Sequence, residues 1–225
     1  VLAGEVKVDG HVVDKPAERF SEEAVVEIKE KPRFVGRGGL KLEGALVEFG
    51  VDVTGWVCLD VGASTGGFTD CLLQRGAAKV HAVDVGTNQL VWKLRSDPRV
   101  ISKEKFNARH MEEGDLGEKV RLAVMDLSFI SLTKVLPAVF RILEEGGEVI
   151  CLIKPQFELE RGDVGKGGIV RDEALRERAV SKIRRFVTEE HGREWLGVVP
   201  ASIAGTDGNQ EFLAWIGSKN TKKIE

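Results

Sequence analysis

The sequence predicts an α/β domain built on a mostly parallel sheet of seven strands, with helices on both faces and a small appendage in front. From about residue 56 onward, short apolar segments alternate with segments of helical periodicity, which is the pattern of strands joined by crossover helices. Most of the apolar segments are nearly continuous rather than alternating, as expected of strands that are covered on both faces. A chain of 225 residues is long enough for one such domain and a small addition.

The elements of the main domain follow from this alternation. Strands are expected at residues 56–60, 79–84, 100–102, 121–126, 148–154, 195–202 and 211–216. Helices are expected at residues 40–49, 66–75, 88–95, 132–143 and 172–190. Glycines directly after several of these helices, such as Gly50 and Gly76, favour helix ends at those points.

The first 39 residues differ in pattern from the rest. Residues 5–13 predict a hairpin with Asp9-Gly10 as its two-residue turn, and residues 24–28 predict a third short strand, which is too little to fold alone. Residues 1–28 are acidic, whereas residues 29–39 are basic and contain Pro32 and three glycines. We therefore expect a small unit at 1–28, a basic linker at 29–39, the main domain at 40–218 and a basic tail at 219–225.

Composition narrows the class of protein. The net charge is −3 and 42% of the residues are hydrophobic, so a sizeable core is expected and wholesale disorder is not. No run of 18 apolar residues predicts a membrane span, and no signal-peptide pattern is visible. Three cysteines without a CxxC pair favour neither disulfides nor a zinc site and fit a reducing cytoplasm. The start at Val1 instead of Met is expected of a fragment of a longer chain.

Four of the predicted strands end in a charged residue, namely Asp60, Asp84, Asp126 and Lys154. Ligands of open parallel sheets bind in the crevice beyond the carboxyl ends of the strands. One such residue could simply mark the start of a polar loop. Four in succession predict that these side chains converge on a single crevice.

A glycine-rich turn follows the first of these strands. Residues 60–68 read DVGASTGGF, and the spacing is neither that of the dinucleotide fingerprint nor that of a P-loop. Asp84 lies about 20 residues further on, where an acid can hold both ribose hydroxyls of a nucleoside. These features favour S-adenosylmethionine over a nicotinamide cofactor, with Asp60 organising the turn around the zwitterionic tail of the ligand.

Lys154 precedes Pro155, so the chain turns there and the ammonium group is expected in the crevice. Such a lysine is either a structural cation or a base whose pKa is lowered by burial and by a neighbouring cation. Lys41 could be that neighbour, with Asp126 and Glu211 as counter-charges. A base at this place could remove the proton of a ribose hydroxyl, which is a poor nucleophile.

At this point the residues resemble the TlyA group (haemolysin A-like proteins) within the FtsJ-type ribose methyltransferases. The matching motifs are FVGRGGLKL (34–42), LDVGASTGGFTD (59–70), AVDVG (82–86), MDLSFISL (125–132), IKPQFE (153–158) and VGKGGIVRD (164–172). The resemblance implies a Rossmann-like class I S-adenosylmethionine-dependent methyltransferase fold. It implies a Lys-Asp-Lys-Glu catalytic set, which falls on Lys41, Asp126, Lys154 and Glu211, with Lys154 as the base-like residue.

The resemblance also implies the cofactor contacts and the partner. The implied contacts are Gly62, Ala63, Ser64, Thr65, Gly66, Phe68 and Asp84, with Asn107 on the adenine side; Asp60 and Asp126 complete the expected set. Residues 4–28 resemble the C-terminal half of an alpha-L RNA-binding domain whose opening helices are missing here. Family substrates are cytidines in ribosomal RNA, which implies ribosomal RNA or ribosomal subunits as the partner. Separately, no metal site is expected.

Three other functions stay open at this stage. A membrane-active haemolysin is one, although no amphipathic or apolar spanning segment supports it. A non-catalytic module that binds RNA or the cofactor is another, and the four catalytic candidates argue against it. A small-molecule methyltransferase with the same fold is the third, and the basic linker and the alpha-L remnant favour RNA instead.

Overall fold

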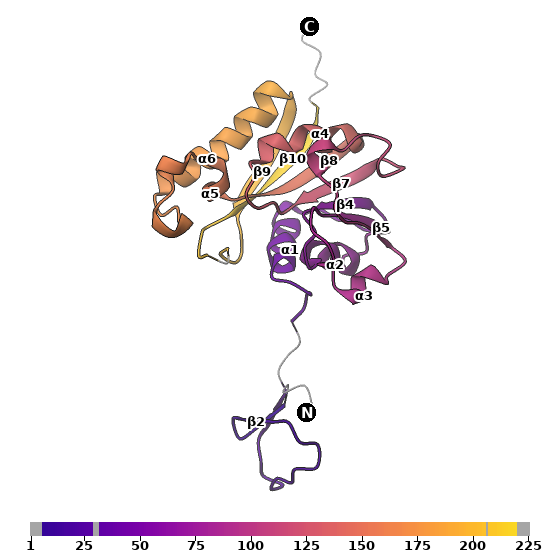
Figure 1. Ribbon diagram of the computed structural model, residues 1–225, viewed down its shortest axis with the longest axis vertical. Helices are drawn as coiled ribbons and strands as arrows, with labels where there is room; N and C mark the ends of the chain where they lie inside the picture. The colour runs from indigo at the N-terminus through magenta and orange to yellow at the C-terminus, as the bar shows by residue number, and fades with distance from the viewer. Residues whose placement is uncertain (1–5, 29–31, 206, 220–225) are drawn as a thin grey trace. The chain divides into compact units, whose positions relative to one another are not determined.

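The computed structural model describes residues 6–28, 32–205 and 207–219, and the chain divides into two units, Val1–Arg33 and Phe34–Glu225 (Figure 1). The predicted tail beyond residue 219, like Lys29 and Lys31 of the predicted linker, lies outside the described residues.

The first unit is a three-stranded antiparallel sheet. Its strands are β1 (Val6–Val8), β2 (His11–Val13) and β3 (Val26–Ile28), in the order β2-β1-β3. Asp9 and Gly10 both have positive φ, at 49° and 82°, as a two-residue hairpin turn requires, so the predicted hairpin is confirmed. Its derivation from an alpha-L domain stays a prediction.

The second unit contains a seven-stranded sheet in the order β6-β5-β4-β7-β8-β10-β9. The strands are β4 (Val57–Val61), β5 (Lys79–Val83), β6 (Val100–Lys103), β7 (Val120–Met125), β8 (Leu143–Ile153), β9 (Arg193–Pro200) and β10 (Phe212–Lys219). Strands β4 to β8 pair in parallel, whereas β10 runs antiparallel to both β8 and β9. The predicted mostly parallel sheet is confirmed.

Helices cover both faces of this sheet (Figure 1). They are α1 (Gly38–Phe49), α2 (Gly67–Gln74), α3 (Trp92–Arg95), α4 (Leu136–Ile142), α5 (Pro155–Glu158) and α6 (Glu173–Arg185). Leu42 of α1 and Leu72 of α2 belong to one buried cluster, and Val139 of α4 and Ile183 of α6 belong to the other. Each cluster contains inward-facing strand residues, so the sheet is buried on both faces, as its continuous apolar strands predicted.

The predicted linker is shorter than expected. Phe34 is only 4% exposed and packs in the first cluster, and the backbone N–H of Val35 donates to the buried carboxylate of Asp70 at 3.0 Å. Helix α1 begins at Gly38, inside the predicted linker. Residues 34–39 therefore belong to the main domain.

Two predicted helices are also shorter than expected, for backbone reasons. Asn88 has a left-handed φ of 55°, so the helix predicted from residue 88 begins only at Trp92. Pro137 lies in the first turn of α4 and has no N–H to donate, so the preceding residues form a separate 3-10 turn, Leu132–Lys134. Beyond Arg185 the last predicted helix continues as a π-helical turn, Phe186–Glu190.

Within the described ranges, no helix combines the length and the apolarity needed to cross a membrane. The same residues contain no cluster of three or more His, Cys, Asp or Glu side chains that could hold a metal ion.

Candidate active site

At two positions, the turn after β4 approaches its neighbours too closely for a side chain. Gly62 has a φ of +84°, and a Cβ at that position would lie 2.4 Å from the backbone oxygen of Asp126. Gly66, with a φ of +100°, would place a Cβ 2.2 Å from Leu94 Cδ1. The two glycines therefore let the turn pack between the end of β7 and helix α3.

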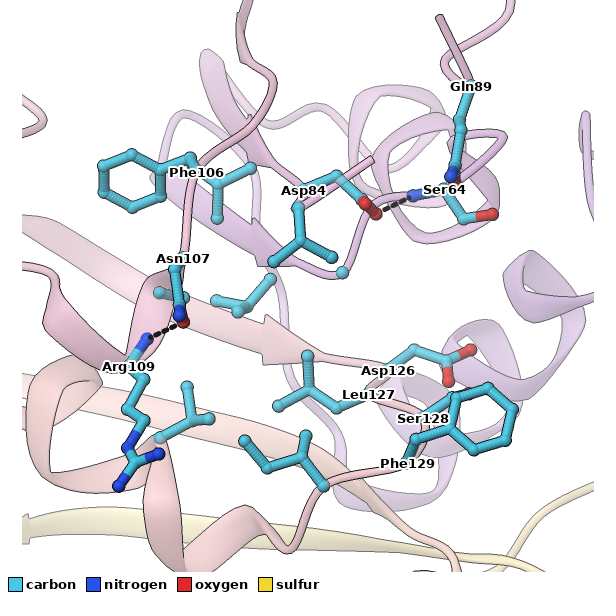
Figure 2. A pocket seen from close by; sticks show the side chains of 17 residues that line it. Ser64, Asp84, Gln89, Phe106, Asn107, Arg109, Asp126, Leu127, Ser128 and Phe129 are labelled. Carbon is cyan, nitrogen blue, oxygen red and sulfur yellow. Dashed lines mark hydrogen bonds between the residues drawn. The ribbon is translucent and has the colours of Figure 1, made fainter. Parts of the chain in front are cut away.

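Asp84, directly after β5, holds two backbone segments together. Its Oδ2 accepts from the N–H of Ser64 at 2.8 Å, and its Oδ1 accepts from the N–H of Gly86 at 2.7 Å (Figure 2). A carboxylate has about four lone-pair sites, so each oxygen can accept one more hydrogen bond. Asp84 therefore keeps the acceptor sites that binding of two adjacent hydroxyl groups would need, and that role stays a prediction.

A cavity of about 370 Å³ opens between the carboxyl ends of β4, β5 and β7 and the segment that follows β6 (Figure 2). Five of the predicted cofactor residues line it: Gly62, Ser64, Asp84, Asn107 and Asp126. Sequence reasoning missed several other lining residues: Gln89, Phe106, Arg109, Leu127, Ser128, Phe129 and Ile130. The segment after β6 could have been found by the same rule that found the other strand ends, because it also leaves the carboxyl edge of the sheet.

A smaller neighbouring cavity of about 160 Å³ lies between the glycine turn and the start of α1. Ala63, Thr65 and Phe68, three further predicted residues, line it. Its opposite wall consists of Gly36, Arg37 and Gly38, and it shares Gly62, Ser64 and Asp126 with the larger cavity.

Two predicted cofactor residues, Asp60 and Gly66, line neither cavity. Gly66 is the N-cap residue directly before helix α2, and it packs against Leu94. Asp60 is fully buried within β4, and its Oδ2 accepts from Thr69 Oγ1 at 2.6 Å. Its position suits the predicted role of organising the turn from beneath.

The environment of Asp60 makes the site attractive to a cation. Burial raises the pKa of the Asp60 carboxyl to about 7; the Thr69 hydrogen bond opposes this shift, and the carboxylates of Asp126 and Asp84 add to it. Asp60 Oδ1 has no hydrogen-bond partner among the described residues. Three carboxyl groups so close together favour a positively charged ligand, which would relieve their mutual repulsion.

The four predicted catalytic residues form two ion pairs. Lys154 Nζ lies 2.6 Å from Asp126 Oδ1 and donates to Ser128 Oγ at 3.0 Å. Lys41 Nζ lies 2.5 Å from Glu211 Oε2, and both of these side chains are buried.

The topology of the sheet brings the two pairs to the same edge. Asp126 and Lys154 follow the carboxyl ends of β7 and β8. Because β10 is antiparallel, it begins at this edge, and Phe212 is in register with Ile153, so Glu211 comes opposite Lys154. Gly38, one turn before Lys41 in α1, would place a Cβ 3.7 Å from Asp126 Oδ2. The two pairs thus lie at the same edge of the sheet, with each lysine paired to one acid. Of the four strand-end residues that were predicted to share one crevice, only Asp84 and Asp126 line the larger cavity.

The loop after β7 carries an aromatic ring at the mouth of the larger cavity. Phe129 is 90% exposed and has a left-handed φ of 65°, an unusual conformation for a bulky residue. Its ring contacts Phe157, with 5.1 Å between the ring centroids. Figure 2 shows Phe129 beside Ser128 and close to Asp126.

Comparisons with known proteins identify relatives of this chain. Hemolysin A of Brachyspira hyodysenteriae is 48% identical over an alignment that spans 95% of this chain and 89% of that protein. The 16S/23S rRNA (cytidine-2'-O)-methyltransferase TlyA of Mycobacterium tuberculosis is 44% identical over 99% of this chain and 83% of its own length. A solved structure of a provisionally named hemolysin from Streptococcus thermophilus has a TM-score of 0.82 at 45% identity, covering 97% of this chain and 80% of that one.

The family comparison covers nearly the whole second unit. The profile of the FtsJ-like methyltransferases matches residues 34–218, a range that begins at the buried Phe34 and includes both ion pairs. The chain therefore belongs to the FtsJ-like methyltransferase family.

Proposed function

We propose that the protein transfers the methyl group of S-adenosylmethionine to the 2′-hydroxyl of a cytidine ribose in ribosomal RNA. The Asp126–Lys154 ion pair carries this proposal, because it sets a lysine nitrogen beside a cavity that suits a cationic nucleoside. The name of the relative from Mycobacterium tuberculosis supports cytidine and ribosomal RNA. A ribosomal RNA substrate also implies work in the cytoplasm, on ribosomal subunits or their RNA.

The cavity residues fit S-adenosylmethionine in their chemistry. Asp84 can accept from the two ribose hydroxyls while it keeps its backbone partners. Phe106, Asn107 and Leu127 offer apolar and amide surface for the adenine. Asp60 and Asp126 supply the negative charge that suits the cationic sulfonium end. When bound, the cofactor supplies an electrophilic methyl group on a positively charged sulfur.

The protein's own groups prepare the hydroxyl for attack. Lys154 accepts the hydroxyl proton after it has released its own proton from the ion pair with Asp126, which is general-base catalysis. With the cofactor bound, its sulfonium would supply the methyl group to the ribose oxygen and leave as a neutral thioether, and the hydroxyl proton would remain on Lys154. Asp126 and Ser128 fix the Lys154 nitrogen through the two contacts at 2.6 and 3.0 Å. Lys41 and Glu211 form a buried ion pair that fixes the adjacent part of the same sheet edge. Holding the hydroxyl and the methyl group in line supplies much of the remaining rate.

Phe129 supports a nucleic-acid substrate over a small molecule. Aromatic side chains that stack on an unpaired base contribute about 1–3 kcal/mol per base. A ring that is 90% exposed beside Ser128 and Asp126 is placed to stack on the base of the target nucleotide (Figure 2). We assign residues 1–28 to RNA binding as the remnant of an alpha-L domain.

The test is methyl transfer from radiolabelled cofactor to ribosomal RNA, followed by alkaline hydrolysis. Methylation of the 2′-oxygen blocks alkaline cleavage at the next phosphate, so label in resistant dinucleotides is expected. Label in mononucleotides would mean that a base is methylated, and the ribose assignment would then be wrong.

Lys154→Ala should abolish this transfer and leave cofactor affinity, measured by calorimetry, nearly unchanged, because Lys154 does not line either cavity. Lys119→Ala is the matched control, since Lys119 forms a partly exposed ion pair with Glu113 away from the carboxyl edge. A comparable loss of cofactor binding in Lys154→Ala would make Lys154 a binding residue instead of the base.

A further inference from the structure

Another buried acid, Glu158, lies four residues after Lys154 in the chain. Glu158 ends helix α5, and its side chain is only 1% exposed. Burying a carboxylate is costly unless it is paired and hydrogen-bonded. Glu158 meets both conditions, because it accepts from Ser131 Oγ at 2.5 Å, from the N–H of Leu132 at 2.7 Å and from Lys182 Nζ at 3.2 Å.

These contacts join three segments of the main domain. Ser131 and Leu132 lie at the far end of the loop that follows β7, Glu158 lies in the turn that follows β8, and Lys182 belongs to α6. Lys182 also donates to the backbone oxygen of Glu158 at 2.6 Å, which fixes the acid from the side opposite the loop.

Lys154 and Glu158 contact the loop after β7 at its two ends. The backbone N–H of Phe157 donates to the carbonyl of Lys154 at 2.9 Å, so Lys154 and Glu158 are fixed on one short turn. Lys154 contacts Asp126 and Ser128 at the near end of the loop, and Glu158 contacts its far end.

The loop between these two points needs support. Phe129 holds a left-handed backbone conformation, which is strained for such a residue and persists only where the surroundings enforce it. At the near end, the N–H of Asp126 donates to the carbonyl of Val61 at 3.1 Å. At the far end, the bonds to Glu158 provide the anchor.

We infer that Glu158 is a positioning residue for methyl transfer: it holds the loop after β7 so that Asp126 and Ser128 fix the Lys154 nitrogen and Phe129 stays at the cavity mouth. The effect of Glu158 on the loop follows from its contacts alone. Its effect on catalysis rests on the proposed function.

The first test compares Glu158→Ala with Glu158→Gln. The alanine variant loses every acceptor, so kcat should fall by about 10- to 100-fold, the scale expected when reacting groups are misplaced by about 1 Å. The glutamine variant keeps one acceptor oxygen for the loop and should recover a large part of kcat. Glu148→Gln is the matched control, because Glu148 also forms a mostly buried ion pair but does so on β8 with Arg121. It should leave kcat unchanged.

A purely structural role would give a different pattern. Glu158→Ala would then lower the melting temperature while kcat per folded molecule stayed at the original value, and that result would overturn the inference. If Glu158→Ala does not fold, Ser131→Ala removes one loop contact without leaving Lys182 unpaired. An unchanged kcat in folded Ser131→Ala would equally count against the inference.

Hydrogen exchange separates this inference from the proposed function. In Glu158→Ala, or in Ser131→Ala if needed, the amides of residues 127–132 should exchange faster, with little change in the rest of the sheet. Faster exchange in an enzyme that transfers no methyl to ribosomal RNA would refute the function and keep the anchoring role. Unchanged exchange in that loop would refute the anchoring role whatever the activity.

Discussion

We expect Asp60 to make cofactor binding depend on pH. Burial raises the pKa of its carboxyl from 3.8 to about 7 in the folded protein, so the folded state holds an extra proton between about pH 4 and 7. The stability of the unliganded protein should therefore fall as pH rises through that window. A cationic ligand favours the ionised carboxylate, and its binding releases the proton.

We predict that affinity for S-adenosylmethionine decreases as the pH is lowered from 8 to 6, by up to about tenfold per pH unit, because the ligand must displace the Asp60 proton. Calorimetry in buffers of different ionisation enthalpy measures both the affinity and the proton release. Asp60→Asn should flatten the profile. An equally steep profile in that variant would assign the proton to another group.

Asp84 should govern affinity for the nucleoside part of the cofactor. Asp84→Ala removes the charged acceptor of the Ser64 and Gly86 amides and of the expected ribose hydroxyls, and hydrogen bonds to charged groups contribute about 1.5–3 kcal/mol each. Cofactor affinity should fall at least tenfold by calorimetry. Asp97→Ala, which affects an ion pair with Arg99, should bind normally. Normal binding by Asp84→Ala would show that the cavity is misassigned.

The sequence predicted which residues lie at the carboxyl edge of the sheet better than it predicted the role of each one. Charged residues at strand ends share an edge in any parallel sheet, so Asp84, Asp126 and Lys154 were found directly. Gly66 looks like a ligand-contacting glycine in the same motif as Gly62, yet its neighbour is Leu94. That contact depends on how α3 packs, which no local pattern records. The buried Glu158 was missed because its partners lie on two segments that are distant in the sequence, the loop after β7 and helix α6.

At the scale of elements, the turn after β4 requires glycine at residue 62 for two reasons, its positive φ and the lack of space for a Cβ. An alanine at Gly62 would combine a positive φ with a Cβ 2.4 Å from the Asp126 carbonyl oxygen, whereas Gly55 has a similar φ of +76° with no atom within 4 Å. Comparing the two positions therefore separates backbone strain from collision.

We predict that Gly55→Ala costs about 1–2 kcal/mol in free energy of unfolding, from its left-handed backbone alone. Gly62→Ala should cost about 1–3 kcal/mol more, because backbone at β7 must move, and it should also weaken cofactor binding. Urea denaturation and calorimetry measure the two effects. Equal losses of stability at both sites would mean that the turn can shift without cost.

Most elements were predictable because long apolar strands and amphipathic helices carry periodic patterns. Helix α5 was not, since its four residues after Lys154 are too few to show a period. Helix starts were displaced where single residues decide the backbone, as at Asn88 and Pro137. The linker boundary was misplaced because burial of Phe34 depends on tertiary packing.

At the scale of the whole main domain, the proposed site is divided between the two halves of the sheet. The ends of β4, β5 and β7 and the segment after β6 surround the cofactor cavity. The ion pairs also need β8, β10 and α1. Lys41 and Glu211 are separated by 170 positions in the chain, so their pair forms only when β10 has inserted between β8 and β9.

From this separation we expect the two parts of the site to form in a fixed order during folding. Contacts between distant parts of a chain form late, because the loop between them must first be closed. During refolding from urea, stopped-flow fluorescence should detect cofactor capture before quenched samples regain methyl transfer. Simultaneous recovery would instead indicate a single cooperative step. If cofactor capture recovers first, a partly folded intermediate can hold the methyl donor before the ion pairs have assembled, and strand β10 then acts as a checkpoint of completed folding.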